Sequence, residues 1–108
     1  MSAGRLYRVV KGKPKDEPNV SLWAKWFEAA TRVVEQTTIE EVLVSTVFLG
    51  LNYNFSGKGP PVLWETIIFG GALDGKEQRY TSVKAAKEGH KKMVARVKRA
   101  VRNGTKKQ

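Results

Sequence analysis

The chain has 108 residues, no cysteine, one histidine and a formal net charge of +10. This length fits a single domain, and the lack of cysteine excludes disulfides, thiol nucleophiles and Cys-rich zinc sites. No apolar run approaches the ~20 residues that span a bilayer, and the N-terminus lacks the core of a signal peptide, so we expect a cytoplasmic protein with no membrane partner.

The positive charge is concentrated at one end of the chain. Residues 84–108 hold ten of the 20 Lys/Arg residues and one of the ten acids, which leaves residues 1–83 close to neutral. A one-sided positive field attracts polyanions. We therefore expect the partner to be a nucleotide, a nucleic acid or an acidic protein surface.

The N-terminal third of the chain predicts a strand, a loop and a helix. Residues 5–10 favour a short strand, and a polar stretch with two prolines follows up to residue 19. Ser21 is a suitable N-cap for a helix over residues 22–36. The apolar residues of that segment recur at helical spacing, and Glu28 precedes Arg32 by four residues, as in a stabilising helical pair.

Two apolar segments rich in β-branched residues, 42–51 and 62–69, predict buried strands. The Gly/Pro-rich connector 52–61 makes them an antiparallel hairpin with a long tip, and residues 79–81 add a short third strand. Because both faces of the two main strands are apolar, we expect the outer face to be buried against a second subunit, which predicts a homo-oligomer.

The C-terminal segment 83–102 predicts a helix capped by Ser82 and ended by Asn103-Gly104. Gly89 within it marks close packing or a slight bend. Together these elements predict an α+β fold, a small antiparallel sheet built on the long-tipped hairpin with two helices packed on it. We expect residues 1–20 to form an N-terminal strand and polar loop, 21–102 to form a single α+β domain, and 103–108 to be a disordered basic tail.

Basic side chains flank the apolar stripe of the last helix and form the candidate polyanion site. Arrays of Lys and Arg contact phosphates, whereas the simpler alternative is a well-solvated surface helix. The predicted polyanion-binding residues are Lys84, Lys87, Lys91, Lys92, Arg96, Lys98, Arg99 and Arg102.

A second candidate site surrounds the hairpin tip. The tip lacks the spacing of a Walker phosphate-binding loop, yet it offers backbone N–H groups, a lysine and aromatic rings to a nucleotide or to single-stranded bases; the alternative is a flexible tip. Glu65 lies mid-strand on an apolar face and predicts either an ion pair, with Arg79 or a basic residue of the last helix, or a ligand contact. The predicted ligand-binding residues are Asn52, Tyr53, Asn54, Lys58, Glu65, Arg79, Tyr80 and His90.

Nothing in the sequence indicates catalysis. His90 lies on an apolar stripe, where a hydrogen-bonded core histidine is a commoner interpretation than a catalytic base. No Ser/His/Asp spacing and no second carboxylate for Glu65 is evident. We therefore predict a protein that is not an enzyme and has no metal or cofactor.

The segments VSTVFLGLNYNFSGKGPPVLWETIIFGG, RYTS and GHKKMV, with WAKWFEAATRVV before them, resemble small proteins encoded by bacteriophages and prophages. The likeness covers roughly residues 20–97 and brings no catalytic residues with it. It implies a non-catalytic binding protein that antagonises a host defence system, by sequestering a nucleotide signal or by blocking a host complex. Two alternatives stay open, a nucleic-acid-binding accessory protein that uses the basic helix and a structural protein of the virion.

Overall fold

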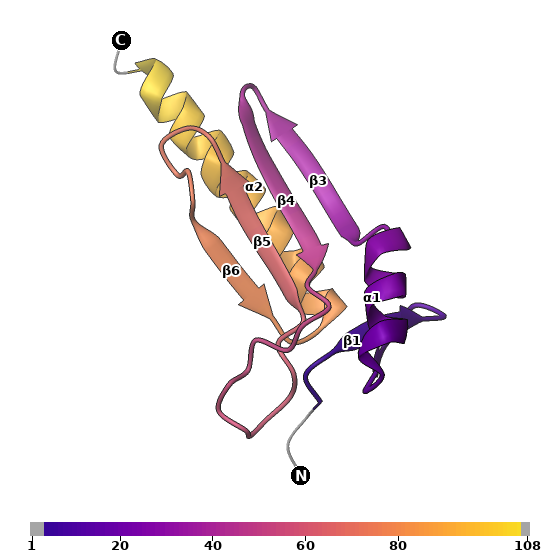
Figure 1. Cartoon of the computed structure of the whole chain (residues 1–108). Helices are drawn as coiled ribbons and strands as arrows, with labels where there is room; N and C mark the ends of the chain where they lie inside the picture. Colours follow the sequence, from indigo (N-terminus) through magenta and orange to yellow (C-terminus); the bar gives the residue numbers. More distant parts are fainter. Residues whose placement is uncertain (1–3, 107–108) are drawn as a thin grey trace.

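The computed structural model of the chain describes residues 4–106, the last two of them by their backbone alone. The elements are β1 (Tyr7–Val10), β2 (Lys13–Asp16), α1 (Val20–Ala29), β3 (Val33–Ile39), β4 (Val42–Phe48), β5 (Trp64–Phe69), β6 (Glu77–Tyr80) and α2 (Val83–Lys106). Their arrangement is shown in Figure 1. Within residues 4–106, no helix combines the length and the hydropathy needed to cross a membrane.

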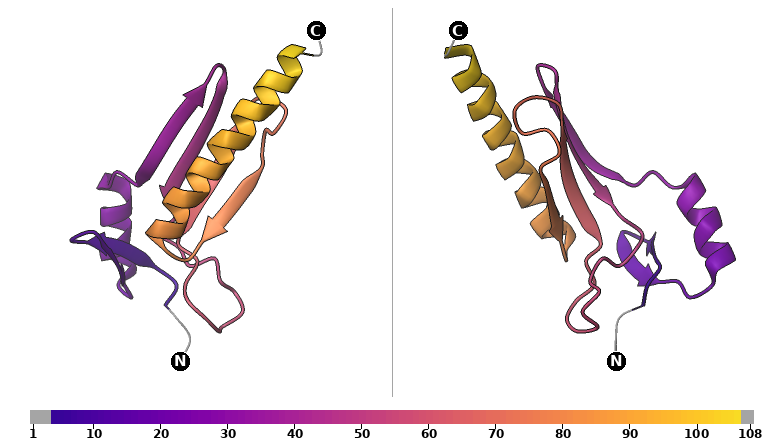
Figure 2. Two further views of the ribbon diagram at one scale, coloured as in Figure 1. Left: turned by 180° about the vertical axis from the view of Figure 1, so that it is seen from behind. Right: turned by 60° about the vertical axis from the view of Figure 1, so that its left-hand side comes forward.

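The fold is α+β, as the sequence predicts. β3, β4, β5 and β6 form an antiparallel sheet in that order, while β1 and β2 form a separate hairpin. The long-tipped hairpin is β4–β5, in which Ser45 pairs with Ile67 at the centre of the sheet. α2 covers one face of the four-stranded sheet, and no helix covers the other face (Figures 1 and 2). We call this second face the open face.

The predicted first helix is wrong in its extent. α1 begins after the N-cap Asn19, whose side-chain oxygen accepts from Leu22 N at 3.0 Å, and the backbone turns extended at Ala30. The segment that follows forms edge strand β3, because five of its seven residues are β-branched and pair along β4. The expected Glu28–Arg32 helical pair is therefore absent, and Arg32 instead donates to Phe48 O at 3.1 Å.

The N-terminal polar segment is also more ordered than predicted. β1 and β2 are joined by Lys11 and Gly12, both with positive φ (52° and 79°), as in the two-residue turns that suit hairpin twist. The hairpin is tied to the chain after β4 by Tyr7 N donating to Gly50 O at 2.9 Å. α1 packs against β1 beyond the end of the sheet, so only one of the two helices covers a sheet face.

α2 is longer than the sequence predicts. Ser82 caps it as expected, since Ala85 N donates to its Oγ at 3.1 Å. Asn103-Gly104, however, does not end the helix, which continues to Lys106 and corrects the expected tail at residues 103–106; residues 107–108 lie outside the described part of the chain. This last part of α2 runs past the sheet (Figure 2).

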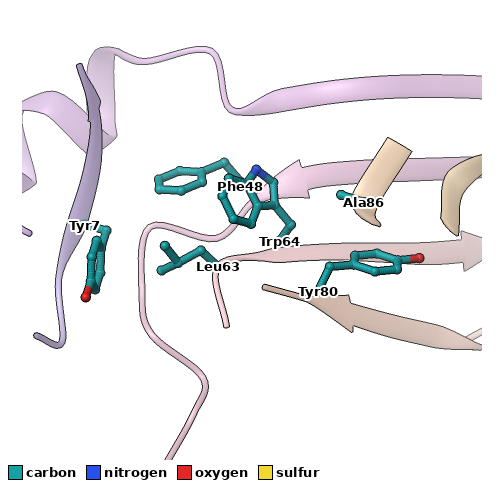
Figure 3. Close-up of a cluster of buried hydrophobic side chains, with 6 residues drawn as sticks. All are labelled: Tyr7, Phe48, Leu63, Trp64, Tyr80 and Ala86. Atoms are coloured by element: carbon teal, nitrogen blue, oxygen red, sulfur yellow. The ribbon is translucent and has the colours of Figure 1, made fainter. Parts of the chain in front are cut away.

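The core lies between α2 and the sheet in two apolar clusters. The first joins β1, β4, β5, β6 and α2 (Figure 3) and consists of Tyr7, Phe48, Leu63, Trp64, Tyr80 and Ala86. The second consists of Val42, Val44, Ile68, Met93 and Val97. Because α2 supplies residues to both clusters, its orientation on the sheet is fixed at two points along its length.

Candidate nucleic-acid interface

α2 is a ridge that stands above the sheet with one side buried. Its buried stripe is Ala86, His90, Met93 and Val97, which recur every three or four residues and face the strands. Tyr80 lies directly against the helix backbone at Gly89, where an added Cβ would sit 2.2–2.4 Å from the end of the tyrosine ring. Gly89 therefore serves close packing, one of the two roles that its position in the sequence suggested.

The rest of the α2 surface carries mostly cations, with Glu88 as an exposed acid among them. All eight predicted polyanion-binding side chains are exposed to solvent. Among residues 4–106, none of the eight lies in a salt bridge with an acid; the ion pairs there involve Arg8, Arg79 and His90 instead. One hydrogen bond engages this set, from Arg96 Nη1 to the sulfur of Met93 at 3.7 Å. The cations are thus available to an external partner.

The charges on α2 lower the stability of the helix instead of raising it. Within residues 83–104, three pairs lie at i,i+4 spacing with like charge, namely Lys87 with Lys91, Lys92 with Arg96, and Lys98 with Arg102, against two pairs of opposite charge, Lys84 with Glu88 and Glu88 with Lys92. Each such pair destabilises a helix by about 0.2–0.5 kcal/mol. An anion bound along the ridge would remove this repulsion, so binding and relief of strain act in the same direction.

Two grooves flank the ridge, and each receives cations from α2. On the β3 side, a groove of about 250 Å³ is bordered by Lys91 and Lys98. On the β6 side, a groove of about 410 Å³ is bordered by Lys92 and Arg96. Glu35 also lines the first groove and Glu88 the second, so α2 presents two cations to each side beside one acid.

Beneath the ridge, His90 is the centre of a polar network that crosses all four strands. Tyr80 Oη donates to Thr66 Oγ1 at 3.1 Å, Thr66 bonds to Thr46, and Thr46 Oγ1 lies 2.7 Å from His90 Nδ1. His90 Nε2 lies 2.8 Å from Thr37 Oγ1. Each hydroxyl can donate once and accept twice, so these threonines can satisfy either neutral tautomer of the imidazole.

Burial favours the neutral form of His90. The side chain is 1% exposed. Burial lowers the pKa of His90 below its ordinary value of 6.5, and Glu35, whose Oε2 lies 3.8 Å from Nε2, opposes the shift only in part. A neutral imidazole with both nitrogens engaged is the hydrogen-bonded core histidine that was one of the two interpretations of its position.

The hairpin tip is held by its own side chains. Asn52 is 4% exposed; its side-chain oxygen accepts from Asn54 N and Val62 N at 2.8 and 3.0 Å, and its Nδ2 donates to Gly4 O. The amide of Asn54 donates to Lys58 O and Pro60 O at 2.7 and 2.9 Å. Asn54 therefore uses its amide inside the loop, Asn52 uses its amide to join the loop to Gly4, and the Lys58 side chain is exposed.

A third group of predicted residues lies at the border of the open face. Arg79 Nε donates to Glu65 Oε2 at 2.8 Å, which is the ion pair expected for a mid-strand carboxylate, and the guanidinium lies 4.7 Å from the centre of the Tyr53 ring. Arg79 also lies 3.4 Å from Glu77. This arginine is therefore shared by two carboxylates and a ring, all within the chain.

The eight predicted ligand-binding residues consequently do not form one site. Tyr80 and His90 are buried between the sheet and α2, to which His90 belongs. Glu65 and Arg79 lie on the other face of the sheet, and the rest belong to the tip. Sequence analysis did not predict the position of Arg5, whose guanidinium lies 4.6 Å from the centre of the Phe55 ring. Nothing in the sequence connects an N-terminal arginine with a loop 50 residues away. The sequence did contain a sign of the His90 network, because Thr46 and Thr66 interrupt the apolar strands β4 and β5 at positions that pair.

Protein-family models, curated proteins and solved structures yield no match to this chain. Within residues 4–106, no three His, Cys, Asp or Glu side chains lie close enough together to hold a metal ion.

Proposed function

We propose that this protein binds duplex nucleic acid through the exposed ridge of α2. The observation that carries the proposal is the set of eight exposed cations without acidic partners on a helix whose opposite side is buried in the core. Lysine and arginine side chains displace counterions from phosphates, and this supplies most sequence-independent affinity for nucleic acid.

The dimensions of the ridge suit a duplex. Lys84 and Arg102 are 18 residues apart, which corresponds to about 27 Å along a helix axis and to roughly eight base pairs at 3.4 Å each. A helix with its side chains is about 10–12 Å across, close to the ~12 Å width of the DNA major groove. The major groove of duplex RNA is too narrow to admit a helix, so DNA is the favoured duplex.

The chemistry of the ridge supports binding with little sequence preference. Its side chains are lysines and arginines with three or more donors each, and lysine acts on phosphates as a point charge. Glu65 and His90, the two residues considered for acid–base chemistry, are engaged by Arg79 and by threonine hydroxyls. The proposal is therefore a binding function without catalysis.

The test compares two variants with the same net charge. In the ridge variant, Lys91, Lys92, Arg96 and Arg99 are replaced by Gln. In the matched control, four exposed lysines of the near-neutral part of the chain are replaced by Gln, namely Lys13, Lys15, Lys25 and Lys76. Both remove four positive charges, so a difference between them reports the position of the charge and not its total.

Binding is measured by fluorescence anisotropy with a labelled DNA duplex of about 20 base pairs, which is longer than the cation array. For the wild type, log K should fall linearly with log salt. If all four ridge cations contact phosphates, their loss should reduce that slope by about 3–4 in magnitude, while the control keeps the wild-type slope. Equal weakening of both variants, or wild-type affinity that does not change with salt, would overturn the assignment to α2.

A second candidate is a nucleotide bound at the hairpin tip, which would retain the sequence-based hypothesis of a sequestered signal. The observation that favours it is Phe55, which is 73% exposed beside Arg5 and beside Tyr53, whose ring centre lies 6.0 Å away. Exposed aromatics next to cations stack on bases. Calorimetric titration of nucleotides into wild-type and Phe55→Ser protein tests it; binding that survives this substitution would exclude the tip.

A further inference from the structure

The open face of the sheet exposes an apolar patch that no helix or strand within residues 4–106 covers. Alternation along the strands puts Leu43 and Val47 of β4, and Ile67 and Phe69 of β5, on the side opposite α2. The register makes Leu43 a direct neighbour of Phe69, and the small residue Ser45 a neighbour of Ile67, so the patch is continuous. Phe69 is 49% exposed, and the patch belongs to neither core cluster.

The chain exposes more surface than is typical of a compact monomer with the same mass. Its accessible area is 7330 Å², whereas the size scaling of compact monomers gives roughly 6,000 Å² for 12.1 kDa. Its radius of gyration is 16.0 Å, compared with about 13 Å for a compact domain of this length. This excess of about 1,300 Å² belongs to the whole elongated chain, which measures 54 × 30 × 20 Å, and it is larger than the ~800 Å² per partner that a standard interface removes.

The charges at the border of the open face favour a second copy of the chain over a nucleic acid as the binding partner of this face. Its border holds the carboxylates Glu65 and Glu77, with Arg79 between them and already paired with both. A nucleic acid would be repelled by these carboxylates. A second copy of the chain presents the same near-neutral apolar patch, and in a two-fold interface each patch faces an identical one.

Contact through the open face also keeps the two cationic helices apart. Each α2 lies on the far side of its own sheet (Figure 2), and packed layers are separated by about 10 Å. The two helix axes would then be about 30 Å apart, well beyond the ~8 Å over which physiological salt screens exposed charges. A chain of net charge +10 can therefore associate by this face without bringing its charged helices together.

We propose that the chain forms a face-to-face dimer through the open face, and that this dimer bridges two duplexes. The inference rests on the proposed function of α2. Because the ridges point outward on opposite sides of a four-layer particle, one straight duplex cannot contact both. The dimer instead holds one nucleic acid on each outer side, and its activity is to join separate segments.

The test uses two charge-neutral double variants. In the face variant, Ile67 and Phe69 are replaced by Gln on the open face. In the control, Val20 and Leu22, which are 66% and 54% exposed on α1, are replaced by Gln. Circular dichroism checks that both variants fold, and light scattering after size-exclusion chromatography gives the mass without nucleic acid. We expect a dimer for the wild type and the control, and a monomer for the face variant.

Bridging is measured with one biotinylated duplex on beads and a second, fluorescent duplex in solution. The wild type and the control should retain the second duplex, whereas the face variant should retain about tenfold less or none because it has lost bivalency, with its anisotropy-measured affinity per chain for a short duplex unchanged. A monomeric wild type, a face variant that stays dimeric, or a dimer that binds but does not bridge would each overturn the inference. A wild-type dimer that binds no duplex would refute the proposed function and, with it, bridging, while the dimer itself would stand.

Discussion

The packing of Tyr80 on Gly89 makes a prediction that opposes helix propensity. Replacing a helical glycine by alanine stabilises an exposed helix by about 1 kcal/mol. At Gly89 the new Cβ would lie 2.2 Å from Tyr80 Oη and 2.3 Å from Cε1. Tyr80 is 9% exposed and its hydroxyl donates to Thr66, so the ring cannot move without loss of this bond.

The magnitude follows from the competing terms. Overpacking a core costs about 1–3 kcal/mol, and a lost buried hydrogen bond adds about 1 kcal/mol. Against a gain of about 1 kcal/mol in propensity, Gly89→Ala should destabilise the fold by about 1–3 kcal/mol. The control is Gly104→Ala in the last turn of α2, where a Cβ meets nothing within 4 Å, and it should be neutral or stabilising.

Urea unfolding followed by tryptophan fluorescence measures both changes, and the three tryptophans supply the signal. The same substitution in a Tyr80→Leu background tests whether contact with the tyrosine ring causes the loss of stability. Tyr80→Leu removes the three ring atoms that the new Cβ would meet, so in that background Gly89→Ala should lose its penalty and approach the gain expected from propensity. If Gly89→Ala stabilises the wild-type chain by about 1 kcal/mol, the close packing of Tyr80 on α2 is refuted.

Three further predictions concern buried polar groups. The pKa of His90 is lowered in the folded state from its ordinary value of 6.5, so the unfolded state binds more protons as the pH falls through that value. The free energy of unfolding should therefore fall as the pH drops from about 7 to 5. A His90→Gln variant should show a flatter pH profile in urea titrations. Arg79→Ala leaves the Glu65 carboxylate, whose side chain is 9% exposed, without its partner and should lower the free energy of unfolding by about 1–3 kcal/mol. Glu77→Gln, which removes the exposed carboxylate paired with the same arginine, should change stability by less than about 0.5 kcal/mol. Equal effects would contradict the difference in burial between Glu65 and Glu77. Asn52→Ala removes the acceptor of two loop amides and a donor to Gly4 and should cost about 1–3 kcal/mol, with increased hydrogen exchange at Asn54 and Val62, while Asn54→Ala should change exchange within the exposed tip alone.

The elements that were predicted correctly have a strong pattern of their own. β4 and β5 are runs of β-branched and apolar residues, and α2 has a continuous stripe at helical spacing, so local sequence and tertiary packing agree. The error at α1 arose because Val33 and Val34 fit both a helical spacing and a strand. β4 has two edges to satisfy with hydrogen bonds, and pairing with β3 decides between the two patterns.

The candidate sites differ in the same way. The cations of α2 could be read from the sequence because residues at helical spacing share a known surface. The ligand set around the hairpin tip could not, because it combines residues from both faces of the sheet. Strand alternation alone separates Tyr80 from Arg79, which precedes it by one residue, and puts the first against α2 and the second on the open face.

The core beneath α2 explains how one helix can hold so many like charges. Full burial of a Val or Met side chain contributes about 1.5–3 kcal/mol, and α2 buries Met93 and Val97 almost completely, along with Ala86. The three like-charge pairs at i,i+4 together cost no more than about 1.5 kcal/mol. Burial therefore outweighs repulsion, and the solvent side of the helix is free to hold the charge that a polyanion needs. The same separation makes the ridge variant a fair test, because removing its charges should leave the fold as stable as before or slightly more so.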